Sequence, residues 1–167
     1  MAAHYRSHDD RDIHMAQIRH IAIASDHPFK AAEFYKKAFG FREITRNGFD
    51  PSKPDEAPRP CSVLLTDGYL NIALLKLSQD QTGVGLDYQG LHHIGLVVDD
   101  LEGWTQHIEA LGAPNITTLA DMPPTAHTEI KFRGPDNVVF DLSPSPWPGA
   151  APVAPDTMKQ PLEDAVA

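Results

Sequence analysis

The pattern of apolar and polar positions along the chain predicts a strand followed by a helix, and it does so twice. The first strand is QIRHIAIAS, which is rich in β-branched residues, and the next segment, HPFKAAEFYKKAFGF, has apolar residues at helical spacing. The second strand is LHHIGLVVDD, which is followed by DLEGWTQHIEALGA, a predicted helix ending at Gly112. The chain is therefore expected to contain an internal repeat.

Three short strands are expected after each helix. In the first half they are REITRNG, CSVLLTDG and YLNIALLKL, and in the second half NITTLADM, TEIKFRG and NVVFDLSPSP. Overlaying the halves places His20 on His93 and Gly40 on Gly112. The pattern thus predicts an α+β protein built from two β-α-β-β-β units.

The repeat also sets the expected boundaries along the chain. We expect the following segments: a flexible leader over 1–16, a first unit over 17–77, a linker over 78–89, a second unit over 90–144 and a Pro-rich tail over 145–167. The tail is predicted to lie extended over the body of the protein, with Trp147 as its anchor, because proline rigidity lowers the entropy lost on docking.

Composition narrows the choice of partners. The formal charge is −9, from 14 Lys and Arg against 23 Asp and Glu, and no basic cluster interrupts it, so nucleic acid and anionic membranes are poor candidates. A small-molecule substrate is the better expectation. No stretch approaches the roughly 20 apolar residues of a membrane span, and the first residues are too charged for a secretory signal, so we expect a cytoplasmic protein. The single cysteine, Cys61, leaves histidine, carboxylate and hydroxyl groups to build a site.

A histidine stands just before an apolar run in both units. A single histidine at a strand edge is usually structural, but its repetition at matching positions of the two units needs a further explanation. Strand alternation places His93 in register with His20 and sends its neighbour His92 to the outer face or the pocket rim.

Four motifs carry a resemblance to a known family: HIAIAS, FYKKAFGF, HHIGLVVDDLE and GPDNVVFDLSP. They resemble the vicinal oxygen chelate superfamily, which includes glyoxalase I, methylmalonyl-CoA epimerase, extradiol dioxygenases, and fosfomycin- and bleomycin-resistance proteins. The resemblance implies paired βαβββ modules that form a curled, barrel-like mixed sheet around a metal site. It also implies His20, His93 and Asp141 as the metal ligands, with Asp141 where a glutamate is usual. The fourth ligand position falls on Ala73, which has no donor atom.

Two histidines and one carboxylate occupy one face of an octahedral ion and leave positions open for substrate oxygens, water or O2. Our first hypothesis is therefore a dioxygenase-like metalloenzyme, with Fe(II) or Mn(II) favoured and Zn(II), Co(II) or Ni(II) as alternatives. Extradiol dioxygenases usually carry a histidine and a tyrosine before the final glutamate. Here Lys131 takes the approximate tyrosine position and His127 lies close to it, which departs from that pattern.

Two further hypotheses remain open. The first is a glyoxalase- or epimerase-type lyase or isomerase that uses the metal as a Lewis acid and needs a base, for which Glu129 and His127 are candidates. The second is a metal-free drug-binding protein, against which the retained His-His-Asp set counts.

Outside the ligand set, two residues are candidates for catalytic roles. His127 is a candidate general acid or base, and Asn71 is an inward amide that could orient a substrate oxygen. We also expect a homodimer, because curled sheets with exposed edges often associate.

Overall fold

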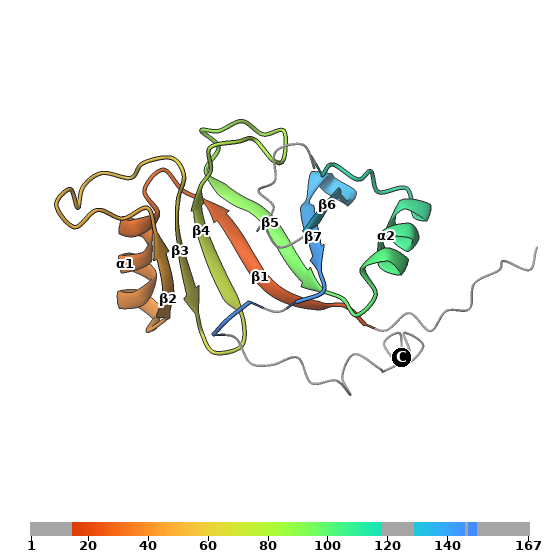
Figure 1. Cartoon of the computed structure of the whole chain (residues 1–167), viewed down its shortest axis with the longest axis horizontal. Helices are drawn as coiled ribbons and strands as arrows, with labels where there is room; N and C mark the ends of the chain where they lie inside the picture. The colour runs from red at the N-terminus through yellow and green to blue at the C-terminus, as the bar shows by residue number, and fades with distance from the viewer. Residues whose placement is uncertain (1–14, 118–128, 146, 150–167) are drawn as a thin grey trace, which may run out of the picture.

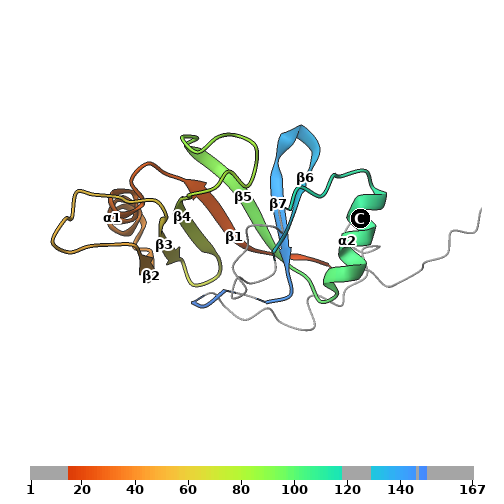
Figure 2. The same ribbon diagram turned by 45° about the horizontal axis from the view of Figure 1, so that its top comes forward.

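The computed structural model of the protein describes residues 15–117, 129–145 and 147–149. Its strands form one mixed sheet of seven strands, in the order β2-β3-β4-β1-β5-β7-β6, which curls without closing (Figures 1 and 2). The elements follow along the chain as β1 (Gln17–Ala24), α1 (Pro28–Phe39), β2 (Arg42–Asn47), β3 (Cys61–Thr66), β4 (Asn71–Lys76), β5 (Gly90–Val97), α2 (Leu101–Ala110), β6 (Ile130–Arg133), the 3-10 turn η2 (Pro135–Asn137) and β7 (Val139–Ser143). The predicted α+β class is confirmed.

Both predicted helices are present, and local signals explain where they start and stop. The His27 side chain caps α1 by accepting a hydrogen bond from the backbone N–H of Lys30, and the Asp100 carboxylate caps α2 in the same way. The first helix ends at Gly40, whose φ of 72° is left-handed and therefore suits glycine. In the described residues no helix is both long enough and apolar enough to cross a membrane.

The second half of the chain contains two of its three expected strands, β6 and β7. The third, NITTLADM, begins where Asn115 forms an isolated β-bridge with Phe132. Its residues from 118 onwards lie outside the described ranges.

The helices cover the outer faces of the sheet at its two ends, as Figure 1 shows. Helix α1 buries Phe29 and Ala32 against β3 and β4, and α2 buries Ile108 in a cluster that includes Phe132 and Leu142. Side chains alternate along a strand, so Leu64 of β3 points to the inner face, opposite the face that α1 covers. It packs with Ala22 and Ala73 in a separate cluster that no helix residue joins. The helices therefore leave the inner face available for a site.

The two halves of the sheet meet at an antiparallel pair, β1 with β5, and each of these strands has a parallel neighbour on its other side, β4 and β7 respectively. In this register His20 lies opposite Gly95, and His93 lies opposite Ala22. A Cβ atom added to Gly95 would lie only 2.1 Å from Cε1 of His20. Each histidine therefore has a small residue of the other half opposite it.

Two irregularities interrupt this central pair. The register shifts between Ile18 and His20 and again between Ala22 and Ile23, so Arg19 on β1 and His92 on β5 have no partner across the pair. An unpaired bulge residue breaks the strict alternation of a strand. Both residues are buried, and both contact the side chains of the site described below.

We predict that Gly95→Ala lowers the free energy of unfolding by about 1–3 kcal/mol, because the added methyl group would displace the His20 imidazole from a tightly packed position. Urea denaturation measures the loss. Leu91→Ala, at an exposed position of the same strand, is the matched control and should change stability by less than about 1 kcal/mol. Equal losses in the two variants would contradict the close packing of His20 on Gly95.

Candidate metal centre

Three buried side chains from three neighbouring strands bring their donor atoms together. The His20 Nε2 atom lies 2.9 Å from His93 Nε2, and the Asp141 Oδ2 atom lies 3.1 Å from His93 Nε2 and 4.0 Å from His20 Nε2. His20 and Asp141 are fully buried and His93 is 3% exposed. The structure thus brings together the three residues that the resemblance implied as metal ligands.

The chemistry and spacing of these donors fit a divalent ion. Ligand nitrogen and oxygen atoms lie about 2.0–2.2 Å from such an ion, so two donors at a right angle are about 3 Å apart, close to the two shorter separations. Burial lowers the pKa of His20 from 6.5 to about 3, which keeps its imidazole neutral and its lone pair free. A neutral imidazole is the form that binds a metal.

The Asp141 carboxylate is held between two cations. Arg19 lies 3.2 Å from Oδ1, and the Nζ atom of Lys131, directly opposite on β6, lies 3.0 Å from Oδ2. Burial alone would raise the pKa of Asp141, but the hydrogen bond from His93 and the charge of Lys131 outweigh it and hold that pKa well below its ordinary value. Asp141 is therefore ionised at neutral pH.

A second carboxylate completes this charge cluster. The Glu129 carboxylate lies 2.6 Å from Arg19 and 3.4 Å from Lys131. Two cations thus face two anions, so the cluster is neutral before any ion or substrate is added. Glu129 was one of the two bases considered from sequence, and it lies beside the proposed ligands.

His92 contacts the ring nitrogen of His93 that faces away from His20 and Asp141. Its Nδ1 atom lies 2.8 Å from the Nδ1 atom of His93, and its Nε2 atom lies 3.3 Å from the hydroxyl oxygen of the buried Thr82. Burial lowers the pKa of His92 to about 4, so this ring is neutral and its Nδ1 atom can accept an N–H from His93. With Nε2 of His93 directed at an ion, its Nδ1–H would be the donor, which is the usual arrangement for a histidine ligand.

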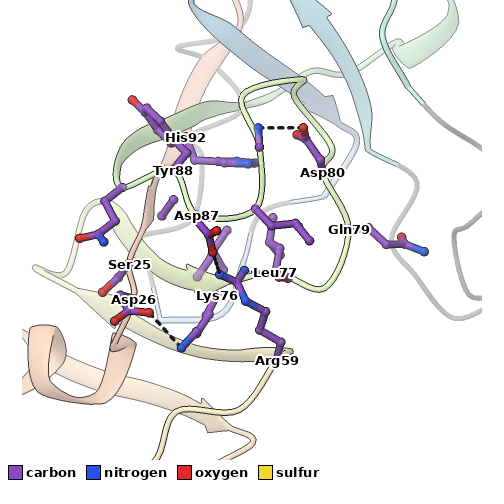
Figure 3. Close-up of a pocket in the computed structure, with 15 residues that line it drawn as sticks. Ser25, Asp26, Arg59, Lys76, Leu77, Gln79, Asp80, Asp87, Tyr88 and His92 are labelled. Atoms are coloured by element: carbon purple, nitrogen blue, oxygen red, sulfur yellow. Dashed lines mark hydrogen bonds and ion pairs between the residues drawn. The ribbon is translucent and has the colours of Figure 1, made fainter.

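His92 also lines a cavity of about 240 Å3 at the ends of β1 and β4 (Figure 3). The charged groups of this cavity pair with each other, Arg59 with Asp87 and Lys76 with Asp26. None of the three proposed ligands lines it. The sequence analysis placed His92 on the outer face or at the pocket rim, and in the structure its buried side chain lies between this cavity and His93.

The described part of the chain after β7 runs across β1 towards β4 (Figures 1 and 2). We call residues 147–149 the C-terminal strap. The indole of Trp147 stacks on the His20 imidazole, with 4.0 Å between ring centroids and 12° between planes, and it also packs on the cluster that contains Ala22 and Ala73. The predicted anchoring of this segment by Trp147 agrees with these contacts.

Of the two residues with predicted catalytic roles, the structure describes Asn71 but not His127. Asn71 is fully buried on the inner face, and its Nδ2 donates to the backbone carbonyl of Pro148 at 3.1 Å. Its Oδ1 has no hydrogen-bond partner in the part of the chain that the structure describes. His127 lies outside the described residues.

Sequence reasoning missed the contact between Arg19 and Asp141. One signal was present in the sequence: Arg19 precedes His20 exactly as His92 precedes His93. Alternation assigned His92 to the outer face or the pocket rim, whereas the two bulges bring both Arg19 and His92 to the side chains of the site.

We predict that the metal-free protein loses stability as the pH falls below about 6.5. The pKa values of His20 and His92 are lowered from 6.5 to about 3 and about 4, so the unfolded chain binds these protons first. The stability that the two neutral rings contribute is fully present above pH 6.5. At pH 5 each histidine should contribute about 2 kcal/mol less to the free energy of unfolding.

Urea denaturation at pH 7.5 and pH 5 tests this prediction. His92→Gln should remove about half of the pH dependence, whereas His107→Gln, in the last turn of α2, should keep all of it. A pH dependence unchanged by His92→Gln would contradict the assignment.

Comparison with known proteins places this site in a family. Residues 17–142 match the model of the Glyoxalase/Bleomycin resistance protein/Dioxygenase superfamily. None of the curated proteins matches the chain.

Several solved structures have a similar fold. A methylmalonyl-CoA epimerase from Mycobacterium tuberculosis is 17% identical, with a TM-score of 0.57 over 83% of this chain and 92% of its own. A variant of Streptomyces coelicolor methylmalonyl-CoA epimerase in complex with 2-nitronate-propionyl-CoA is 20% identical, with a TM-score of 0.53 over 75% and 94%. A hypothetical protein from Bacillus halodurans C-125 is 18% identical, with a TM-score of 0.55 over 77% and 93%. At these identities the likeness is one of fold.

Proposed function

The chain belongs to the Glyoxalase/Bleomycin resistance protein/Dioxygenase superfamily, and from that premise we propose that it is an enzyme that depends on a divalent metal. His20, His93 and Asp141 would hold the ion, and a small substrate with neighbouring oxygen atoms would complete its coordination. The observation that carries this proposal is the convergence of three buried donor atoms from β1, β5 and β7. When bound, the ion would act as a Lewis acid on a substrate oxygen.

The groups beside Asp141 favour proton transfer next to a carbonyl group, which is lyase or isomerase chemistry. The Glu129 carboxylate, 2.6 Å from Arg19, is placed to accept a proton from carbon. The Lys131 ammonium group, 7% exposed, is placed to stabilise negative charge on a substrate oxygen. The epimerases of similar fold act on CoA esters, which makes acids and thioesters with an acidic C–H bond the first substrates to test.

O2 chemistry is the second candidate, and one observation supports it. Among the described residues the donor group contains only three members, and the fourth family position is the buried Ala73. Such a set leaves positions for both a substrate and O2, and would favour Fe(II) or Mn(II). Lewis-acid chemistry would suit Zn(II), Co(II) or Ni(II) as well.

We predict that Asp141→Asn weakens metal binding at least about 100-fold, because two neutral histidines leave the charge of the ion uncompensated. Isothermal titration with Zn(II) and with Fe(II) under argon measures the effect, and circular dichroism checks folding. The control is Glu129→Gln, which removes a neighbouring carboxylate and should change affinity less than about tenfold. His4, His8 and His14 are present in every variant, so the difference between titrations isolates this site. Unchanged affinity in Asp141→Asn would refute the metal centre.

The reaction class has its own test. In D2O the metal-loaded protein should exchange the C3 hydrogens of 2-oxobutanoate, followed by NMR, and Glu129→Gln should slow the exchange about 100-fold or more. Oxygen uptake by the Fe(II)-loaded protein with catechol, together with no exchange in 2-oxobutanoate, would favour the dioxygenase instead.

A further inference from the structure

Trp147 occupies the inner face beside the proposed ion. Its indole stacks on His20 at 4.0 Å, and the guanidinium carbon of Arg19 lies 4.8 Å from the ring centroid. Both residues also belong to the metal centre, His20 as a proposed ligand and Arg19 as the partner of Asp141. The indole therefore lies against one proposed ligand and against the ion-pair partner of another.

The indole fills a space whose other neighbours are apolar, and we call this space the slot. Trp147 packs on the cluster made by Ala22, Leu64 and Ala73, with Ile44 at its side. At Ala22 and Ala73 small side chains leave the width that a flat ring needs. Gly149 follows closely along the same face, because a Cβ atom there would lie 2.4 Å from the Ile44 side chain.

Polar side chains lie at the end of this slot, and the strap provides hydrogen-bond partners for only some of their atoms. Asn71 donates to the Pro148 carbonyl, but its own Oδ1, fully buried, has no partner within the described ranges. The Nε atom of Arg19 is buried without a partner as well. Buried polar atoms without partners are unfavourable and are a recognised sign of a missing ligand or water.

Resting on the function proposed above, we propose that the space filled by the Trp147 indole is a substrate subsite for a planar ring, which the C-terminal strap occupies until a substrate displaces it. A ring that stacks on the His20 imidazole and lies near the Arg19 guanidinium gains from both contacts only if it has a π system. The slot should therefore prefer an unsaturated ring to an aliphatic group of equal size. A hydroxyl group on that ring would donate to Asn71 Oδ1 and accept from the Nδ2 that the strap releases. The substrate class is therefore an aromatic compound with polar substituents next to its metal-binding oxygens.

Two probes of nearly equal shape separate ring recognition from simple apolar contact. Phenylglyoxylate and cyclohexylglyoxylate carry the same two neighbouring oxygens, and only the first has a π system. In the Zn(II)-loaded Trp147→Ala variant, titration calorimetry should show phenylglyoxylate binding about tenfold tighter than cyclohexylglyoxylate. Phenylglyoxylate should also bind this variant about tenfold tighter than it binds the unsubstituted protein, because there the Trp147 indole must first leave the slot. Equal affinities for the two probes, or for the two proteins, would overturn the proposal.

A second measurement follows the strap directly and does not need the Trp147→Ala variant to fold. The chain has two tryptophans, so Trp104→Phe leaves Trp147 as the only indole reporter. Phenylglyoxylate should shift its emission to longer wavelength as the ring moves into water, whereas cyclohexylglyoxylate should do so only at about tenfold higher concentration. An emission maximum that stays fixed at saturation with phenylglyoxylate would overturn the displacement.

The metal titrations keep this inference separate from the function on which it rests. If Zn(II) binds and depends on Asp141 but the ring preference is missing, the subsite is wrong and the metal centre stands. If Zn(II) binding does not depend on Asp141, the proposed function fails before any probe is added.

Discussion

Antiparallel pairing of β1 with β5 sets His20 opposite Gly95 and His93 opposite Ala22. An imidazole needs room where a neighbouring strand would normally place a side chain, and a Cβ atom on Gly95 would overlap the His20 ring. The two histidines meet at 2.9 Å only because each half of the chain supplies a small residue for the other half. The same pairing makes β7 the next strand beyond β5, and so brings Asp141 within reach of both rings.

Burying a carboxylate among these histidines requires compensation, because an unpaired charge in the interior is strongly unfavourable. Arg19 and Lys131 provide it from opposite sides of β7: Arg19 lies on β1, beyond β5, and Lys131 lies on the neighbouring β6. Glu129 in turn balances the second positive charge. The metal-free cluster is thus neutral, and adding a divalent ion would leave a net charge of about +2. A substrate that binds as an anion would offset that charge.

Much of this arrangement was predictable from the sequence, for identifiable physical reasons. Helical periodicity and the glycines at 40 and 112 located both helices, and the repeated histidine together with the family resemblance pointed to His20, His93 and Asp141. The positions of Arg19 and His92 were missed, because alternation assumes an unbroken ladder and the apolar pattern does not locate a bulge. The pairing of Lys131 with Asp141 likewise depends on the register of β6 against β7, which sequence alone does not determine.

The two bulges in the central pair lie on opposite strands, and their effects cancel. Residues 17 and 18 pair in the same register as residues 23 and 24, whereas the short stretch between them is offset by one position. A single uncancelled slip would turn every later side chain to the wrong face, away from the helices. With two opposed slips, the disturbance is confined to the segment that carries the histidines. The chemistry of this segment is therefore free to diverge during evolution while the packing of both helices on the sheet is conserved.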